Sequence, residues 1–499
     1  MFKDFFMESK EKYDAVDWSP EAKLPIKDKL WNCAAPTLSC LLPFNVFGYF
    51  LLFFYTDIVG INAATAGTII MFARSFDVFT DVCIGHIVDR SSPKHGKYRS
   101  WAIRSLFPQL IMFVLVFTVV PGTSMTFKIV WAIITYGSYG AICATLGYIP
   151  QNCQVINMTK NVSERASVAG YKGLFENIAI LLVAVAFLPL ANLLAGDTAH
   201  LARGFCIAAI IFSIIAQFPI IMNVKYTRKY ELNYDGTYRE HLKTSVKKGT
   251  LTIKEQLHLF ITNRAAVVIT IGAIIMYIVQ TVRNSMTVYL FKYYFEMPEM
   301  TSISLFFQCG LAMLGALMVS KVIKIVKDSN RAFVIMAIMH SVMYAILYLW
   351  ISATPIEQAQ QSMHFGPMFF LYAFCGLFQG VYYVFPNVMM PSAVDYGIYK
   401  NGVNQSGFIY SFFGAFLTLG GALGSFVSAQ LLNSTGYVAN TTLSSSTLSG
   451  MLFVGILLPA ILSCVHGFIQ SMSGISDKKH TMWVKDIEAR GLSRDEEGA

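Results

Sequence analysis

The residues with the clearest capacity for chemistry lie between Arg74 and Arg99, in a segment that begins apolar and ends basic. Arg74, Asp77 and Asp81 are spaced at i, i+3 and i+7, so a helix would place them on one face. Charged groups at bilayer depth are costly, and they face a bundle interior or a watery cavity. One aspartate would suffice for a purely structural pair with Arg74. We therefore interpret the two carboxylates as a cation or proton site, with Arg74 holding them in place.

A turn and a basic patch follow this acidic face, beginning at Gly85. Such a density of positive charge is typical of a cytoplasmic loop between two spanning helices. We expect the charged residues of the loop to pair with helix ends at the cytoplasmic edge and to stabilise an outward-facing state. The residues expected to do so are Asp89, Arg90, Lys97 and Arg99.

The composition is that of an integral membrane protein. Of the 499 residues, 55% are hydrophobic and only 13% are charged, whereas about a quarter of a soluble chain is charged. Apolar segments of about twenty residues or more recur along the chain, and each is long enough to cross a bilayer as a helix. The net charge of +9 comes mostly from loop Lys and Arg, which favours a membrane topology over nucleic-acid binding.

The apolar segments predict an all-α fold of about 12 transmembrane helices in two six-helix bundles. A long basic stretch divides the two groups, as in a two-bundle secondary transporter with its site between the halves near midplane. The predicted order is a cytoplasmic N-terminal segment, a first bundle, a central cytoplasmic loop, a second bundle and a cytoplasmic tail. These cover residues 1–30, 31–223, 224–263, 264–472 and 473–499.

The distribution of Lys and Arg predicts the orientation. Four regions are dense in these residues, and three loops on the opposite side have none, so both termini are expected in the cytoplasm of a cell-membrane protein. No cleavable signal peptide is expected in the polar first thirty residues. The basic regions are 89–100, 224–263, 321–331 and the tail, and the loops without Lys or Arg are 56–62, 353–366 and 433–448.

Other chemistry is not indicated. The nine Cys form no C-x-x-C or Cys/His cluster, so neither a disulfide framework nor a zinc site is predicted. His340 and His466 are isolated in apolar segments, where packing is the simpler interpretation. No phosphate loop, nucleophile elbow or metalloenzyme motif is recognisable. We expect a protein that is not an enzyme and needs no cofactor beyond a coupling ion.

Several motifs appear in a familiar order along nearly the whole chain. Together they resemble the glycoside–pentoside–hexuronide:cation symporters, the melibiose-carrier-like branch of the major facilitator superfamily. The helix-2 and loop pattern is the specific part of the resemblance. The matching residues are Phe54-Tyr55-Thr56-Asp57-Ile58-Val59-Gly60, Ala73-Arg74 with Asp77 and Asp81, Gly85, Asp89, Gly96-Lys97-Tyr98-Arg99, Trp101, Ile149-Pro150, Glu164-Arg165, Val394-Asp395-Tyr396-Gly397, Lys400 and the Tyr289–Tyr293 segment end.

The resemblance implies a site for the coupling cation. In that family two acids on helix 2 bind the cation, and a Thr on helix 4 contributes to the site. The matching residues in this sequence are Asp77, Asp81 and Thr145. Carboxylate and hydroxyl oxygens suit Na⁺, as they suit other hard cations. A proton would serve instead if repulsion and desolvation raised the pKa of one Asp. Asp395, in a supporting motif, is expected to have a gating or structural role.

The sugar side departs from the family pattern. The two acids that hold galactosyl hydroxyls in melibiose-type carriers are replaced here by Leu41 and Tyr148, which argues against a galactoside. Aromatic and amide groups remain that could stack on a sugar or hydrogen-bond it. The candidates are Tyr148, Asn152, Tyr382 and Tyr383.

Two cationic residues suggest an acidic substrate. Lys172 stands where the family has a helix-5 Arg, and Arg283 lies in the middle of segment 7. A bidentate Arg is suited to a carboxylate such as that of a hexuronate. The alternative is structural: Arg283 would pair with Glu176 or with a helix-2 Asp.

The expected function is cation-coupled symport of a glycoside or sugar acid, with a hexuronide favoured over a galactoside. The expected partners are a small-molecule sugar and the lipid bilayer, without nucleic acid, and the protein is expected to be monomeric. A lipid-like or other organic solute is the alternative substrate, because lysolipid symporters share the helix-2 pattern. A membrane sensor on a transporter scaffold is a more distant alternative.

Overall fold

The computed structural model describes residues 16–17, 22–91, 96–159, 161–232, 237, 253–403 and 405–490, apart from some side chains within helices. The chain forms two compact units. Unit 1 comprises Met1–Ile61 and Thr68–Ser245, and unit 2 comprises Asn62–Gly67 and Val246–Ala499. This division rests on contacts and not on membrane boundaries, so the predicted bundle and loop limits stay predictions.

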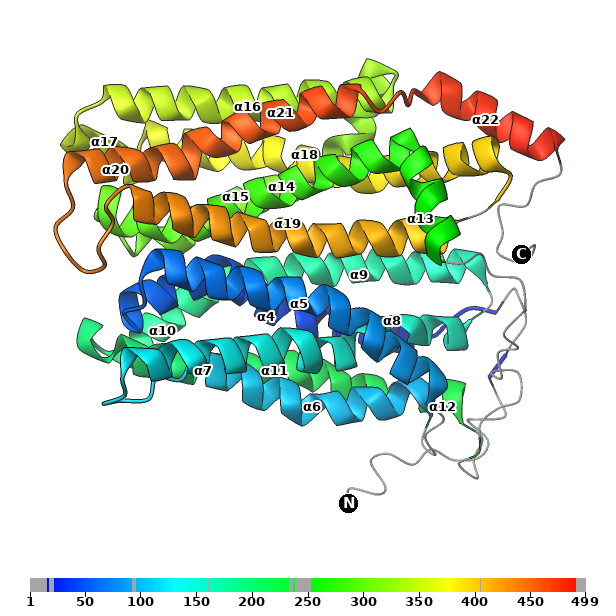
Figure 1. Ribbon diagram of the computed structural model, residues 1–499, viewed down its shortest axis with the longest axis horizontal. Helices are drawn as coiled ribbons and strands as arrows, with labels where there is room; N and C mark the ends of the chain where they lie inside the picture. Colours follow the sequence, from blue (N-terminus) through cyan, green and yellow to red (C-terminus); the bar gives the residue numbers. More distant parts are fainter. Residues whose placement is uncertain are drawn as a thin grey trace. The chain divides into compact units, whose positions relative to one another are not determined.

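Unit 1 is built from long helices that run along one another (Figure 1). Several of them are interrupted by π-helical turns. Its first span runs from Ile26 to Leu51 and contains two prolines, which lack a backbone donor. The elements are α3 (Ile26–Pro36), η1 (Thr37–Leu41), α4 (Leu42–Val46), η2 (Phe47–Leu51), η3 (Phe54–Ile58), α5 (Ala63–Arg90), α6 (Lys97–Val116), α7 (Met125–Ser138), η4 (Tyr139–Ala144), α8 (Thr145–Met158), α9 (Val162–Leu182), η5 (Val183–Phe187), α10 (Leu188–Ala195), η6 (Thr198–His200), α11 (Leu201–Tyr226) and α12 (Arg228–Glu231).

Unit 2 is helical in the same way, and a further helix follows its last span. That helix, α22, lies in the predicted tail and packs Trp483 against Tyr396 of α18, with ring centroids 4.9 Å apart. The elements are α13 (Ile253–Thr262), α14 (Arg264–Tyr289), η8 (Leu290–Tyr294), α15 (Met300–Val326), α16 (Ser329–Ala353), α17 (Ile356–Met363), α18 (Pro367–Asn401), α19 (Ser406–Ser434), α20 (Ser445–Leu452), η9 (Phe453–Leu457), α21 (Leu458–Ser471) and α22 (Asp477–Ala489).

Within the described residues, ten helical segments are long and apolar enough to cross a membrane. Helices α5 and α6 are 28 and 20 residues long but carry charged residues, and they fall outside that set. They correspond to the predicted second and third segments. The all-helical membrane fold predicted from the sequence is thus confirmed. The longest of these helices, α18, continues through Pro386 and Pro391 to Asn401.

Close helix packing in unit 2 depends on small residues. Gly380 of α18 lies directly against the backbone of Ala312 of α15, and Gly376 lies against that of Gln308. Small residues let transmembrane backbones approach where lipid supplies no hydrophobic driving force between helices. The contact between α15 and α18 therefore has no room for a side chain at these positions.

This packing predicts that Gly380→Ala destabilises unit 2. The added methyl group would lie 1.8 Å from the Ala312 carbonyl oxygen, and overpacking of this kind costs about 1–3 kcal/mol. Gly310→Ala is the matched control, since that position has no atom within 4 Å and Ala favours a helix. Thermal unfolding of the purified proteins should show a lower Tm only for Gly380→Ala. Equal Tm values would contradict the packing described here.

Candidate functional site

A buried carboxylate lies where a helix of unit 1 is interrupted. Asp77 of α5 is only 5% exposed, and its two oxygens face Gly140 of the π-helical turn η4. A side chain at position 140 would begin 2.6 and 2.7 Å from those oxygens. π-helical turns inside helices frequently occur at functional sites. The absence of a side chain at Gly140 is what allows Asp77 to reach the helix backbone.

The predicted helix-4 ligand reaches the same place. The Thr145 hydroxyl is buried and donates to the Gly140 carbonyl oxygen at 3.2 Å. The structure thus brings Asp77 and Thr145 together at one glycine that sequence reasoning did not single out. No sequence signal distinguishes Gly140 from the chain's other glycines. Asp81 lies on the same helix, but its side chain is outside the described residues.

Arg74 is anchored by aromatic side chains that were also missed. Its Nε donates to the Tyr136 hydroxyl at 2.8 Å, and its guanidinium lies 4.2 Å from the ring centroid of Phe44. It also attracts Asp77 electrostatically. Cation–π contacts contribute about 0.5–1 kcal/mol at exposed sites and about 2 kcal/mol when desolvated, and Arg74 is partly buried. The sequence predicted that Arg74 faces the acid, but not which groups of α4 and α7 hold it.

Three of the predicted substrate residues form one cluster in unit 1. Lys172 of α9 donates to Asn152 Oδ1 at 2.8 Å and to the Tyr148 hydroxyl at 3.5 Å. Its ammonium also lies 5.3 Å from the Tyr148 ring centroid. Glu176, one turn further along α9, interacts with Lys172 electrostatically. The cluster combines one cation with neutral donors and acceptors and with a nearby carboxyl group.

Arg283 is buried inside unit 2, where it is 2% exposed. Its terminal nitrogens donate to the amide oxygens of Gln308 and of Asn284, the latter at 2.6 Å. Gln308 donates in turn to the Tyr344 hydroxyl at 3.0 Å. The Tyr383 hydroxyl also interacts with the guanidinium. Amide oxygens therefore accept hydrogen bonds from Arg283. The sequence predicted only carboxylates as partners of this residue.

Tyr382 belongs to the packed interior of unit 2. Its hydroxyl is 2.6 Å from His466 Nδ1, and its ring stacks on His340 at 5.0 Å. His340 Nδ1 lies 2.9 Å from the Ser463 hydroxyl. All three rings are fully buried. Both histidines thus pack within the core of unit 2, as their isolation in the sequence suggested, and Tyr382 packs with them.

The predicted gating residues lie at helix ends. Arg99 is buried near the start of α6, and its Nε donates to the Val224 carbonyl oxygen at 2.7 Å. Asp395, near the end of α18, lies 2.7 Å from His480 Nε2 of the tail helix α22. The side chains of Asp89, Arg90 and Lys97 are outside the described residues.

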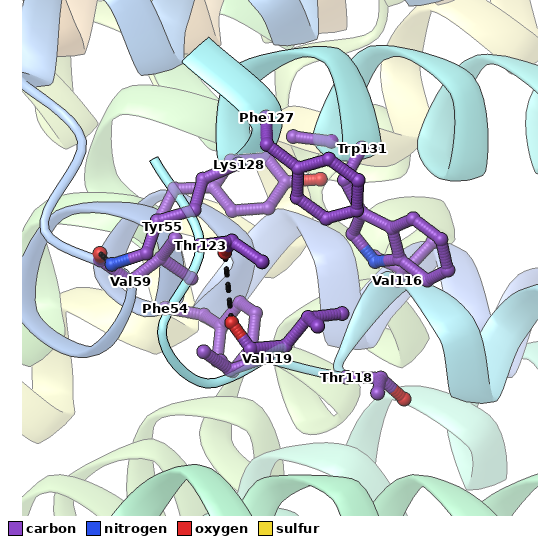
Figure 2. Close-up of a pocket in the computed structure, with 12 residues that line it drawn as sticks. Phe54, Tyr55, Val59, Val116, Thr118, Val119, Thr123, Phe127, Lys128 and Trp131 are labelled. Atoms are coloured by element: carbon purple, nitrogen blue, oxygen red, sulfur yellow. Dashed lines mark hydrogen bonds between the residues drawn. The ribbon is translucent and has the colours of Figure 1, made fainter. Parts of the chain in front are cut away.

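A separate small pocket in unit 1 lies beside aromatic side chains of η3 and α7 (Figure 2). Lys128 lines it, and its ammonium donates to the Val59 carbonyl oxygen at 3.0 Å. None of the residues predicted to bind ion or substrate is among those that line this pocket. We assign no function to it.

Comparison with known proteins agrees with this architecture. A family model described as MFS/sugar transport protein matches residues 33–474. The chain belongs to that family. It is 28% identical to an uncharacterized symporter, YnaJ, of Bacillus subtilis (strain 168) over 92% of this chain and 94% of that protein. It is 27% identical to the isoprimeverose transporter of Lactiplantibacillus pentosus, covering 87% and 84%, and 26% identical to the glucuronide carrier protein homolog of Escherichia coli (strain K12), covering 88% and 91%.

A solved structure supports the fold. The chain aligns with a bacterial homologue of the human lysosomal transporter Spinster, in an inward-facing and unoccupied conformation, with a TM-score of 0.63 at 11% identity. The alignment covers 93% of this chain and 99% of that one. This likeness concerns the fold alone. With the family match, it makes the chain a multi-pass membrane transporter of the major facilitator type, and not an enzyme. The family description and the names of two of these relatives refer to sugars or sugar derivatives.

The anchoring of Arg74 predicts unequal effects at two neighbouring tyrosines. Tyr136→Phe removes the hydroxyl that accepts from Arg74, and a hydrogen bond to a charged group contributes about 1.5–3 kcal/mol. Tyr139→Phe is the matched control, because the buried Tyr139 hydroxyl has no hydrogen-bond partner among the described residues. Thermal unfolding should show a lower Tm for Tyr136→Phe and an unchanged or higher Tm for Tyr139→Phe. The reverse order would refute the assignment.

Proposed function

We propose that this protein is a cation-coupled symporter of a sugar derivative that works by alternating access. The observation that carries the proposal is the meeting of Asp77, Thr145 and Gly140 in the interior of unit 1. A carboxylate withdrawn from water among apolar helices needs positive charge nearby. Arg74 supplies part of it, and a coupling cation would supply the rest when bound.

The proposed ion site consists of Asp77, Asp81 and Thr145, with the coupling ion Na⁺ or H⁺. Carboxylate and hydroxyl oxygens are ligands that hard cations prefer. A π-helical turn such as η4 also leaves backbone carbonyl groups outside the regular α-helical ladder, which supports the choice of this place. Both termini are proposed to lie in the cytoplasm, from the Lys and Arg distribution.

The proposed substrate is an acidic sugar such as a hexuronide. Lys172 in unit 1 contacts neutral amide and phenol groups and interacts with Glu176. Arg283 in unit 2 donates to amide oxygens. Such groups, with Tyr148, Asn152 and Tyr383 among them, can hydrogen-bond sugar hydroxyls while the cations attract a carboxylate. The similarity to a glucuronide carrier homolog supports this class of substrate. Because the chain is also similar to an isoprimeverose transporter, a neutral glycoside is the alternative against which the acidic sugar is tested.

The ion site predicts that Asp77→Asn and Gly140→Ala both abolish cation-driven accumulation. The first removes a ligand charge, and the second places a methyl group 2.6 Å from a carboxylate oxygen. Accumulation in proteoliposomes should fall about tenfold or more, which corresponds to ~1.4 kcal/mol. Gly137→Ala is the matched control on the same helix, because its nearest contact would be at 4.0 Å.

Imposed Na⁺ and pH gradients, applied separately, identify the coupling ion in the same assay. Downhill exchange of substrate is expected to survive partly in the Asp77→Asn protein, because exchange does not require net ion movement. Normal gradient-driven accumulation by Asp77→Asn would refute the ion site. Equal losses in Gly137→Ala and Gly140→Ala would show that the helix tolerates no change there and that the effect is one of folding.

The substrate proposal predicts selective damage by Arg283→Ala. Truncating one partner of a buried charge pair costs about 2 kcal/mol or more, so binding of a glucuronide should weaken by that amount. Binding of a neutral disaccharide of similar size should change much less. Equilibrium binding of both ligands to the purified protein provides the measurement.

Gln308→Ala is the control for a structural role, because it removes a hydrogen-bond partner of Arg283 and leaves the charge. If Arg283 only ties helices together, both variants should weaken the two ligands alike and lower the Tm to a similar extent. That result would remove the support for an acidic substrate and leave the ion site untouched.

A further inference from the structure

A fully buried carboxyl group joins two helices at one end of unit 1. Glu231, the last residue of α12, has no exposed surface. Its Oε2 accepts from the backbone N–H of Arg99 at 3.3 Å, and its Oε1 accepts from Gln154 Nε2 at 3.1 Å. The first N–H groups of a helix have no partner within that helix. Glu231 therefore caps the start of α6 from a different helix.

The start of α6 is shaped for this carboxyl group. Gly96 is the N-cap residue of α6, and no side chain at its own position provides a cap. Its φ of 92° lies in the region that favours glycine. A side chain at Gly96 would begin 2.4 Å from Glu231 Oε2. Glycine at this position thus permits the positive φ of the turn and leaves room for the Glu231 carboxyl group.

Gln154 connects the cap to the rest of unit 1. Besides Glu231, its amide nitrogen donates to the Thr227 hydroxyl at 2.7 Å. Its amide oxygen accepts from Asn32 and from Asn223, at 3.1 and 2.8 Å. All these side chains are buried. A change at Glu231 is therefore transmitted to α3, α8 and α11 through one amide.

The charged groups around Glu231 come from several helices. Arg99 attracts it electrostatically, although the Arg99 Nε is held by the Val224 carbonyl oxygen. On α12 itself, Lys229 pairs with Asp28 of α3 at 2.8 Å, and the Tyr230 hydroxyl donates to the same aspartate. On α9, Glu164 pairs with Lys29 of α3 at 2.6 Å. Glu164 also accepts from the backbone N–H of Leu24 at 3.0 Å, whereas Glu231 accepts from both a backbone N–H and the amide of Gln154.

Burial raises the pKa of Glu231 from 4.5 to about 7, against the lowering effects of the Arg99 backbone and side chain and of Gln154. The neighbouring Glu164 differs, because the Lys29 ammonium lowers its pKa below the ordinary value. Two carboxyl groups in the same region thus have opposite tendencies. Of these two carboxyl groups, Glu231 is the one whose pKa is raised toward neutral pH.

We propose that the contact between Glu231 and the start of α6 is a proton-sensitive joint, closed while the carboxyl group is protonated and loosened when it ionises. A protonated carboxyl keeps acceptor oxygens for the N–H and amide donors, without a buried charge. An ionised carboxylate gains by moving into water. The pH on this side of the protein would therefore bias the conformation of unit 1, whatever ion is coupled to transport.

The sign of the effect follows from linkage. The closed joint has a carboxyl group with a raised pKa, so it binds a proton more tightly than an open, hydrated joint does. Its stability is present at low pH and is lost as the pH rises through about 7. Between about pH 6 and about pH 8, the ratio of closed to open joint should fall about tenfold.

Amide hydrogen exchange on the full-length protein in lipid nanodiscs tests the proposal. Protection at the start of α6, corrected for the intrinsic pH dependence of exchange, should fall about tenfold between about pH 6 and about pH 8. Glu231→Gln cannot ionise, although its amide keeps one acceptor oxygen instead of two, so protection of this segment should be equal at both pH values. Glu164→Gln is the matched control, and it should retain the pH dependence of the wild-type protein.

Two results would overturn the proposal. One is wild-type protection at the start of α6 that is equal at both pH values, and this measurement needs no variant. The other is a folded Glu231→Gln protein that still loses protection as the pH rises. If Glu231→Gln fails to fold, the wild-type titration decides alone: a midpoint within about one pH unit of 7 supports the joint, and any other midpoint excludes it.

Discussion

The desolvation of Asp77 is the constraint on which the interior of unit 1 depends. A carboxylate among apolar helices loses its hydration, and the surrounding groups must replace it. Here a glycine in a π-helical turn admits the carboxylate, and a threonine hydroxyl is bound to that glycine. Arg74 provides compensating charge, and it is itself held by Tyr136 and Phe44. Side chains of α4, α5 and α7 thus meet around this charge.

Unit 2 surrounds a buried charge of the opposite sign in a different way. Arg283 donates to amide oxygens, and these connect onward to a tyrosine hydroxyl. Amides and phenols satisfy the N–H groups of a guanidinium but do not neutralise it. The histidines nearby are held by neutral hydroxyl groups and add hydrogen bonding rather than compensation. A buried cation held by amide oxygens is why an anionic substrate is the proposal favoured for the chain.

The sequence predicted the helical fold, because this depends on local hydrophobic length and helix periodicity. It named Tyr148, Asn152 and Lys172 as substrate candidates, but not that they contact one another, and the acidic face of α5 stays a prediction at Asp81. It did not predict Gly140, Tyr136 or Gln154 as partners, since which face of one helix meets another is decided by packing over the whole unit. Glu231 shows the same limit. Its sequence neighbourhood, Lys229-Tyr230-Glu231, is that of a solvated loop, yet its side chain is fully buried. The helix α22 was not predicted, because its many charged residues are typical of a solvated tail. Only two of its residues, Trp483 and Ile487, are buried.

The raised pKa of Glu231 affects how any pH dependence of transport should be interpreted. A Na⁺-coupled carrier containing this group would still respond to pH, because the closed joint at the start of α6 binds a proton. Such a response would act on the conformational equilibrium and not on the number of protons moved per substrate. An H⁺-coupled carrier would show both effects, since the proton would also be a thermodynamic partner of the substrate. Only a measurement against an imposed gradient separates them, because a uniform change in pH alters the joint and leaves the driving force unchanged.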